Sequence, residues 1–294
     1  MERKFRVNLP PDPNPRRPRF TPPKGTCDTH FHVFGPPHLF PFVEQRIYTP
    51  PAAPIEHFLM MAGIVGIERG ILVVPNVHGF DHAMLFDALE KADGRLRGMI
   101  RANPALSQAD FRALHGRGVR GIRFNAVAEL RGGFDTANFQ AIIGRVETLG
   151  WPVDLHIDPE LLVEHADLFR RVQTPLVIDH FGRIDPAAGL EQPAFKVLLD
   201  LLGEGNVWVK ISGADRFVER GAQYQDMVPY ARALIARAPE RIIWGTDWPH
   251  SNIFEPGYTP NDGMLMDLMA DFAPDEATRN RILSDNPGRL FWFD

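Results

Sequence analysis

Eight short apolar runs, separated by segments with the polarity of helices, constrain the fold of this chain more than any other feature. The runs span 26–33, 69–75, 97–102, 119–125, 152–157, 175–181, 207–212 and 241–248. Each is continuous rather than alternating, as in ILVV and LVID, which is typical of parallel strands that are covered on both faces. Strands that alternate with helices form a parallel sheet with right-handed crossovers.

Helix candidates follow the strands, for example at 80–93, 108–118, 138–150, 160–172 and 222–238. Glycines stand where several of these helices must end before the next strand begins. Eight such units predict a (β/α)8 TIM barrel, with a doubly wound open sheet as the alternative. No G-x-G-x-x-G motif follows the first strand, which weakens the open sheet that binds dinucleotides.

The chain length of 294 residues does not decide the number of domains, because α/β barrels reach about 250 residues as a single domain. Seven prolines between residues 10 and 23 predict an extended N-terminal arm, since proline lacks the backbone donor that helices and strands need. We therefore expect an arm at 1–23 and one barrel domain at 24–294. Residues 36–54 are expected to form a long loop for the same reason.

Charge and composition restrict the classes of partner and the cellular location that we expect. The 32 Lys and Arg residues against 37 Asp and Glu give a net charge of −5 without a basic run, so we expect no nucleic acid partner. No apolar run approaches the roughly 18 residues of a membrane span, and no signal-like stretch opens the chain. With Cys27 as its single cysteine, the chain is expected to be cytoplasmic. Homo-oligomerisation stays open.

Histidines concentrate at the predicted strand exits. In a TIM barrel the chemistry lies at the carboxyl ends of the strands. If each exit is taken as four residues, random placement would put about one of the 11 histidines there. Six lie there: His30, His32, His78, His156, His180 and His250. The sequence therefore predicts a site built largely from imidazoles.

The strongest local motif is Asp28-Thr-His30-Phe-His32, at the end of the first strand. Strand alternation directs His30 and His32 into the barrel mouth and Phe31 outward. Asp28, like Asp179 before the sixth-strand histidine, is expected to point away from the site and to make structural hydrogen bonds.

A metal site is the chemistry that this pattern predicts. His156, His180 and Asp247 stand at the exits of strands five, six and eight, opposite His30 and His32. Four neutral nitrogens and one carboxylate suit Zn²⁺ or a similar divalent ion and leave a position open for water.

Four segments together, DTHFHVFG, GIRFN, VIDHFGR and IIWGTDWPH, resemble the amidohydrolase superfamily in its amidohydrolase-2 branch. More closely, the chain is similar to the lactonases of that branch, which act on 2-pyrone-4,6-dicarboxylate, sugar lactones or sulfomuconolactone. The similarity runs from about Pro22 to Trp292. It implies a hydrolase of aromatic compound catabolism that opens the lactone of a small anionic carboxylic acid.

The resemblance also implies roles for single residues. His30, His32 and His180 match histidines of the family site, and Asp247 matches the aspartate that acts as general base on the attacking water. The dicarboxylate lactonase is thought to work without metal, whereas several relatives hold zinc. His156 replaces a tyrosine of that lactonase and so favours one divalent ion, Zn or Mn. Metal-independent action stays open, and Arg123 in place of a lysine argues against a lysine-bridged dinuclear centre.

Anion recognition is predicted at the same end of the barrel. Arg123, Arg183 and Arg216 lie at or just beyond strand exits, and a guanidinium binds carboxylate with two parallel hydrogen bonds. Tyr48 resembles a carboxylate-binding tyrosine of the family. The candidate substrate-binding residues are completed by two at the exit of the second strand, Asn76 and His78.

Lactone hydrolysis needs an activated water, a base for its proton and positive charge where the oxyanion develops. Asp247 can supply the base, and a bound metal would activate the water. Without metal, His30, His32 and His180 would have to donate hydrogen bonds. No G-x-S-x-G motif supports serine catalysis. Two alternatives stay open: a metal-dependent decarboxylase of a small aromatic or unsaturated acid, because a branch of the superfamily uses a very similar site, and a binding barrel without catalysis.

Overall fold

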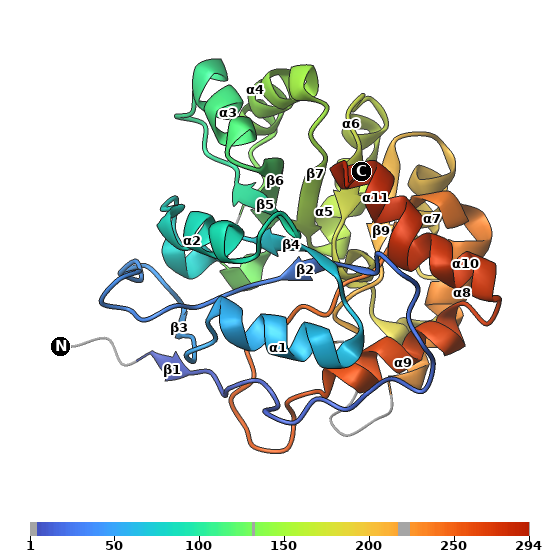
Figure 1. Ribbon diagram of the computed structural model, residues 1–294. Helices are drawn as coiled ribbons and strands as arrows, with labels where there is room; N and C mark the ends of the chain where they lie inside the picture. Colours follow the sequence, from blue (N-terminus) through green and yellow to red (C-terminus); the bar gives the residue numbers. More distant parts are fainter. Residues whose placement is uncertain (1–4, 131–132, 217–223, 294) are drawn as a thin grey trace.

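A ring of eight parallel strands forms the centre of the molecule (Figure 1). The structure is a computed structural model that describes residues 5–130, 133–216 and 224–293. The strands are β2 (Cys27–Phe31), β4 (Arg69–Val73), β5 (Leu96–Arg101), β6 (Val119–Ala126), β7 (Val153–Ile157), β8 (Leu176–Ile178), β9 (Val207–Lys210) and β10 (Ile242–Ile243). Each pairs in parallel with the next, and a parallel bridge between Phe31 and Trp248 joins the two ends of the sheet. The predicted (β/α)8 TIM barrel is confirmed.

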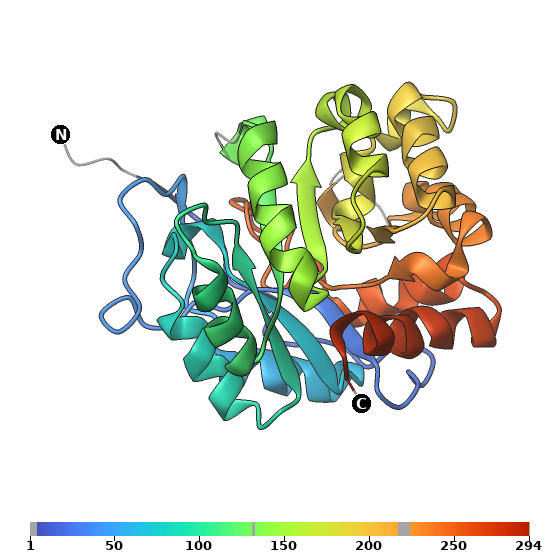
Figure 2. The same ribbon diagram turned by 90° about the horizontal axis from the view of Figure 1, so that it is seen from above.

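Helices surround the strands on the outside (Figures 1 and 2). They are α1 (Ile55–Val65), α2 (Ala83–Lys91), α3 (Gln108–Gly116), α4 (Thr136–Val146), α5 (Pro159–Glu164), α6 (Ala166–Arg170), α7 (Pro193–Gly203), α8 (Val228–Arg237), α9 (Asp262–Phe272), α10 (Glu276–Asn280) and α11 (Asn286–Phe291). In the described parts of the chain, none of them has both the length and the apolarity that crossing a bilayer requires.

The strands separate an outer core from an inner one. Side chains such as Leu155 and Ile178 point outward and join the large cluster that packs against the helices. Val177 and Trp208 point inward and belong to a smaller apolar cluster. This period of two follows from strand geometry. Above the inner cluster, inward positions of the same strands carry polar residues, and these form the base of the site described below.

Most predicted elements are confirmed, and two helices differ from the expectation. The helix expected at 160–172 is divided into α5 and α6, because His165 leaves the helical conformation at φ −106° and its ring packs against Phe134 and Phe169. The helix expected at 222–238 starts at Val228 after a short 3-10 turn. Residues 222 and 223 of the expected range lie outside the described parts of the chain.

The N-terminal segment follows the outside of the barrel (Figure 1). Its strand β1 (Arg6–Val7) pairs in parallel with β3 (Tyr48–Thr49), a small sheet that the sequence did not predict within the loop 36–54. Further along, Arg16 and Arg19 both form ion pairs with Asp267 on α9. The segment therefore connects the loop after β2 with the last part of the barrel.

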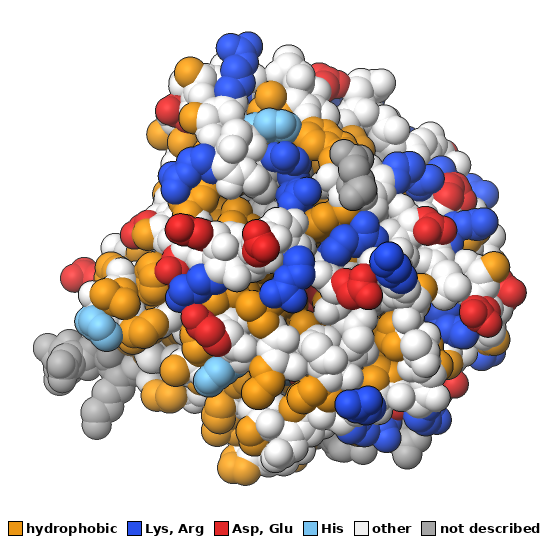
Figure 3. Space-filling model, in the orientation of Figure 1, with side chains coloured by type: hydrophobic (Ala, Val, Ile, Leu, Met, Phe, Trp, Pro, Cys, Tyr) orange, Lys and Arg blue, Asp and Glu red, His pale blue; other side chains and the backbone are white. Residues whose placement is uncertain are grey.

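On the face of the molecule seen in Figure 3, acidic and basic side chains are interspersed wherever the chain is described. No single-sign area that would attract a polyanion dominates that face.

Candidate active site

One pocket opens at the carboxyl ends of the barrel strands. Its walls contain nearly all of the predicted site residues: His32, Tyr48, Asn76, Arg123, His156, His180, Arg183, Arg216 and Asp247. Pro75, Glu129, Leu130, Ser251 and Asn252 complete the lining. His30 does not line the pocket but lies fully buried directly beneath it, against Asp247.

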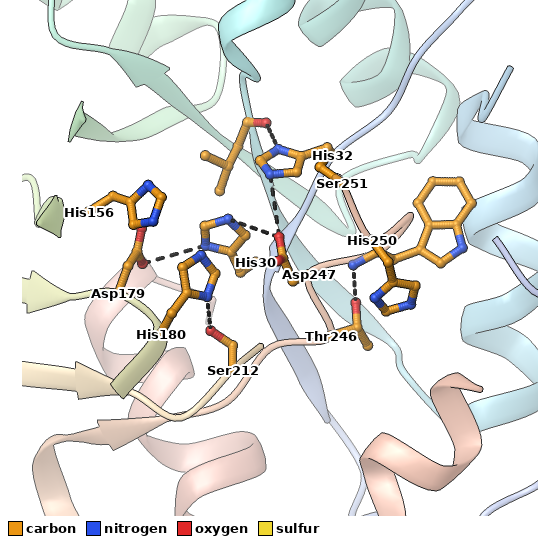
Figure 4. A network of polar contacts seen from close by, with 12 residues as sticks. His30, His32, His156, Asp179, His180, Ser212, Thr246, Asp247, His250 and Ser251 are labelled. Carbon is orange, nitrogen blue, oxygen red and sulfur yellow. Dashed lines mark hydrogen bonds and ion pairs between the residues drawn. The ribbon is translucent and has the colours of Figure 1, made fainter. Parts of the chain in front are cut away.

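His30, His32 and Asp247 form the centre of this site (Figure 4). Asp247 Oδ1 lies 3.6 Å from His30 Nε2 and 3.5 Å from His32 Nε2. His32 Nδ1 lies 2.7 Å from the carbonyl oxygen of Val73, to which it donates a hydrogen bond, and this contact leaves Nε2 to face Asp247. Two imidazole nitrogens thus face one carboxylate oxygen, an arrangement that can surround a cation or a water molecule.

Backbone contacts fix this geometry. The amide of Asp247 donates to the carbonyl oxygen of His30 at 2.8 Å, and the amide of His32 donates to the carbonyl oxygen of Trp248 at 2.7 Å. The Asp28 carboxylate accepts hydrogen bonds from the amides of His30 and Thr246, each at 3.0 Å. The predicted structural role of Asp28 is therefore confirmed, and it ties the first strand to the last.

His180 enters the site from a tight turn after β8. Residues His180, Phe181, Gly182 and Arg183 all have positive φ, between 50° and 66°. Side chains rarely adopt this conformation, and such strain is concentrated at functional sites. The turn places His180 Nδ1 2.9 Å from Ser212 Oγ and His180 Nε2 3.4 Å from Arg123 Nη2.

His156 approaches the cluster from β7 but keeps other partners. Its Nδ1 lies 3.3 Å from Asn125 Oδ1, and its Nε2 lies 3.4 Å from Arg183 Nη1. Its ring centroid is 5.2 Å from that of His180, in an edge-on arrangement. The structure therefore brings His156 next to the cluster without placing it among the residues that converge most closely.

A layer of fully buried charges supports the cluster from below. We call it the buried floor: Arg123, Asp154, Asp179 and Lys210. The Lys210 ammonium contacts Asp154, lies 2.8 Å from Asp179 Oδ1 and 3.2 Å from His30 Nδ1. Arg123 Nε donates to Asp179 Oδ2 at 2.8 Å. The side chains of Asp154, Asp179 and Lys210 are 0% exposed, and that of Arg123 is 6% exposed.

The expectation that Asp179 points away from the site is therefore wrong. Its carboxylate faces the barrel interior, 3.5 Å from His30 Nδ1. Asp179 follows the inward-pointing Val177 by two positions, so strand alternation sends it into the barrel, and the left-handed turn that starts at His180 brings that ring to the same side.

Burial and neighbouring charges set the protonation states. Burial lowers the pKa of His30 and of His156 well below the usual value, and it lowers the pKa of His180 to about 3. Burial raises the pKa of Asp247, but the Arg216 guanidinium and the neighbouring imidazoles lower it more, so that it lies well below its usual range. The site thus presents neutral imidazoles around an ionised carboxylate.

These residues can hold a metal ion. His30, His180 and Asp247 each offer one ligand atom within 4.8 Å of the others. His30 Nε2 and Asp247 Oδ1 are buried and have no hydrogen-bond partner among the described residues. Neutral imidazoles and a carboxylate are the donors that divalent ions such as Zn²⁺ prefer.

A second group of potential ligands lies in the buried floor. His30, Asp154 and Asp179 satisfy the same distance criterion. The Lys210 ammonium already contacts both carboxylates, so a cation is present there without a metal. The group around Asp247 is therefore the candidate metal site.

Three charged side chains and one amide also surround the pocket entrance. We call this set the pocket rim: Asp158, Glu129, Arg183 and Asn252. Arg183 Nε lies 3.0 Å from Asp158 Oδ1, and Arg183 Nη2 lies 3.3 Å from Glu129 Oε2. The side chains of Arg183 and Glu129 are 20% and 49% exposed.

The remaining arginine and the neutral candidates also lie in the pocket. Arg216 binds Asp247 Oδ2 with both its Nε and its Nη2. The Tyr48 hydroxyl donates to Ser251 Oγ at 3.0 Å, and Asn76 Oδ1 accepts from Asn125 Nδ2 at 3.0 Å. Of the predicted anion-binding groups, three arginines, Tyr48 and Asn76 thus converge on one space.

Two histidines at strand exits lie elsewhere. His78 belongs to a 3-10 turn, Asn76–His78, which packs its ring against Phe34 and Phe42 and keeps it out of the pocket lining. His250 Nε2 lies 3.1 Å from Asp262 Oδ1, with both side chains fully buried. Figure 4 shows His250 pointing away from the imidazole cluster.

Sequence reasoning missed several polar residues of the site, and a signal existed for some of them. Asp154 stands two positions before His156 on the same strand, so alternation places both side chains inside the barrel. Lys210 ends the apolar run VWVK, where a charge without a partner would be costly. Glu129 and Asn252 lie in loops, whose course the strand pattern does not predict.

Three comparisons with known proteins agree with this geometry. The family model described as Amidohydrolase matches residues 27–293. The chain is 47% identical over 273 residues to 4-sulfomuconolactone hydrolase from Rhizobium radiobacter, which covers 92% of this chain and 91% of that protein. It is 36% identical over 288 residues to 2-pyrone-4,6-dicarboxylate hydrolase from Comamonas testosteroni, with 95% and 94% covered.

Among solved structures, an apo crystal structure of a protein from Agrobacterium tumefaciens matches with a TM-score of 0.84. The two proteins are 27% identical, and the match covers 94% of this chain and 99% of the other. The similarity thus extends over the whole barrel rather than over isolated motifs.

Proposed function

The chain belongs to the amidohydrolase family, and on this basis we propose that it hydrolyses the lactone, or cyclic ester, of a small anionic carboxylic acid. Relatives with 36% to 47% identity are lactone hydrolases by name. Their similarity covers at least nine tenths of each chain. The family model, which matches residues 27–293, includes every strand of the barrel and every residue of the cluster.

The observation that carries this proposal is the state of the Asp247 carboxylate. Its Oδ2 is held by Arg216, whereas its Oδ1 is buried among imidazoles without a hydrogen-bond partner in the described part of the chain. The contact with Arg216 keeps the carboxylate ionised and oriented, and Oδ1 can therefore accept a proton from a water in the pocket.

Ring opening follows from this geometry. Asp247 takes a proton from the water as the water oxygen attacks the lactone carbonyl. The ester C–O bond then breaks, and Asp247 returns the proton to the ring oxygen that leaves as an alcohol. Cationic groups around the carbonyl stabilise the negative charge that develops on its oxygen. Arg123, whose Nη2 lies 3.4 Å from His180 Nε2, is a buried cation of the pocket lining that can serve this purpose.

We further propose that His30, His32, His180 and Asp247 hold one divalent ion, Zn or Mn, with His156 beside them. Such an ion lowers the pKa of a bound water and polarises a carbonyl. His32 Nε2 supports this proposal because Nδ1 is engaged with the Val73 carbonyl, which leaves Nε2 as the ring nitrogen that faces Asp247 and can bind a cation.

Three arginines favour an anionic substrate. Arg123 and Arg216 each face one carboxylate of the protein and Arg183 faces two, but a guanidinium has five N–H donors, so donors are left for a ligand. The Tyr48 hydroxyl and the Asn76 amide add neutral hydrogen-bonding groups to the same walls. We propose that these five residues bind the substrate and that His78 only shapes the wall behind them.

Product analysis tests the function. Purified protein is incubated with a panel of anionic lactones and with a matched panel of carboxylated aromatic acids, and acid production and CO₂ release are measured. We expect acid from at least one lactone and no CO₂ from any compound. CO₂ release without acid production would identify a decarboxylase, and turnover of neither panel would favour a binding barrel.

Elemental analysis tests the metal. We expect about one divalent ion per chain, loss of activity on chelation and recovery when the ion is returned. Full activity of a protein that contains no metal would contradict the proposed metal site without affecting the proposed reaction.

A further inference from the structure

Glu129 is an acidic side chain of the pocket lining that takes no part in the catalytic cluster. It belongs to the short 3-10 turn Ala128–Leu130 that follows β6. Its Oε2 lies 3.3 Å from Arg183 Nη2, and its Oε1 accepts a hydrogen bond from Asn252 Nδ2 at 3.2 Å. Glu129 thus connects the loop after β6 with the loop after β10 across the pocket entrance.

The charges around Arg183 do not balance. Asp158 already neutralises this guanidinium, with Oδ1 3.0 Å from Nε, and its Oδ2 accepts the amide of Ala128 at 2.8 Å. Glu129 adds a second carboxylate to the same cation.

The other arginines of the pocket differ in this respect. The carboxylate that binds Arg123 is shared with the Lys210 ammonium, and the carboxylate that binds Arg216 is the catalytic Asp247. Negative charge in excess of the neighbouring cations therefore lies at the entrance, where Asp158 and Glu129 face Arg183 alone. At the deep end the charges balance, because three cations face three carboxylates.

We propose that Glu129 determines specificity by weakening the binding of ligands that carry an anionic group at the pocket entrance. Its carboxylate takes the position on Arg183 that such a group would need, and it repels the group as it approaches. Lactones with their anionic group deep in the pocket, near Arg123 and Arg216, and a neutral group at the entrance bind best. The inference rests on the proposed function, which it extends to the charge pattern of the substrate.

Two inert ligands of the same shape test this inference. Isophthalate carries two carboxylates on one ring, and 3-carbamoylbenzoate replaces one of them by a neutral amide. Affinities are measured by titration calorimetry at low ionic strength for the unchanged protein, for Glu129→Gln and for the control Glu90→Gln. Glu90 is exposed near the end of α2, at the opposite end of the barrel, so its substitution makes the same change of charge away from the pocket.

We expect Glu129→Gln to bind isophthalate about fivefold more tightly than the unchanged protein does, which is the size of effect expected for one partly exposed ion pair. Its affinity for 3-carbamoylbenzoate should stay within twofold of that of the unchanged protein. Glu90→Gln should bind both ligands as the unchanged protein does. The inference would be overturned if Glu129→Gln gained affinity equally for both ligands or gained none for isophthalate. It would also be overturned if isophthalate bound neither to the unchanged protein nor to Glu129→Gln. Because neither ligand is a lactone, the result is independent of whether the protein hydrolyses lactones.

Discussion

The buried floor and the pocket rim both pair basic side chains with carboxylates, but in different surroundings. In the floor, Lys210 and Asp179 are fully buried, and their charges interact in a medium of low polarity. In the rim, Arg183 and Glu129 are partly exposed, and water and salt weaken the same kind of contact. The floor can therefore fix the geometry of the reaction, whereas the rim can adjust ligand affinity without endangering the fold.

The largest expected effect is a difference in kcat between a variant in the cluster above the buried floor and a variant in the pocket rim. Asp247→Asn removes the proton acceptor and keeps the size of the side chain, so kcat for the lactone should fall by about 10²- to 10⁴-fold. The matched rim variant, Asp158→Asn, should change kcat by less than about fivefold. Steady-state kinetics on both variants, after a check that they unfold like the unchanged protein, measures the difference. Equal losses would contradict the division of roles.

Substitutions in the buried floor should also lower the free energy of unfolding more than substitutions in the pocket rim. Lys210→Met leaves Asp154 without its cation in a fully buried place, which costs about 3–5 kcal/mol in the free energy of unfolding. Arg183→Met in the rim should cost about 1 kcal/mol or less. Urea unfolding measures both.

The double variant Lys210→Met, Asp154→Leu sharpens this comparison, because it removes the unpaired charge together with its partner. We expect it to recover at least half of the loss of the single variant. If Lys210→Met alone were as stable as the unchanged protein, the floor would not depend on its ion pairs.

A pH effect tests the buried imidazoles. The unfolded His180 ring takes up a proton below its ordinary pKa of 6.5, whereas burial lowers the native pKa to about 3. Between these values the unfolded state binds more protons, so the stability contributed by this difference is lost as the pH falls. From pH 6.5 to pH 5 the loss is about 2 kcal/mol.

His180→Asn isolates this contribution, because other buried groups also titrate. The variant should lose about 2 kcal/mol less stability than the unchanged protein over the same pH interval, measured by urea unfolding without added metal. Parallel losses in the two proteins would show that the native ring is protonated in this range.

The smallest expected effect concerns ligand binding at the rim. Arg183→Gln removes a cation from the pocket lining, and KM for an anionic lactone should rise by about fivefold while kcat stays within twofold. An equal fall of kcat and of kcat/KM would instead indicate that Arg183 contacts the substrate only in the transition state.

Strand pattern and motif spacing predicted the part of the site that lies on regular strands. His30 and His32 meet Asp247 because alternation and the closure of the barrel leave little freedom to residues at strand ends. The interior positions of Asp154 and Lys210 follow the same alternation, but each of these residues is a single charge within an otherwise apolar run, which hides the signal.

Irregular backbone accounts for what the sequence did not predict. The positive φ angles after β8 bring His180 to the same side as Asp179, and the 3-10 turn after β4 carries His78 away from the pocket. Glu129 reaches the entrance through a loop contact with Asn252, more than 100 residues along the chain. Such contacts depend on tertiary packing, which local sequence patterns do not encode.

The central claim is that a water held at Asp247 attacks the lactone carbonyl. Ring opening in ¹⁸O-enriched water, stopped after a single turnover and analysed by mass spectrometry, tests it directly. We expect one ¹⁸O atom in the new carboxylate and none in the alcohol. Label in the alcohol, or a product without label, would contradict the account.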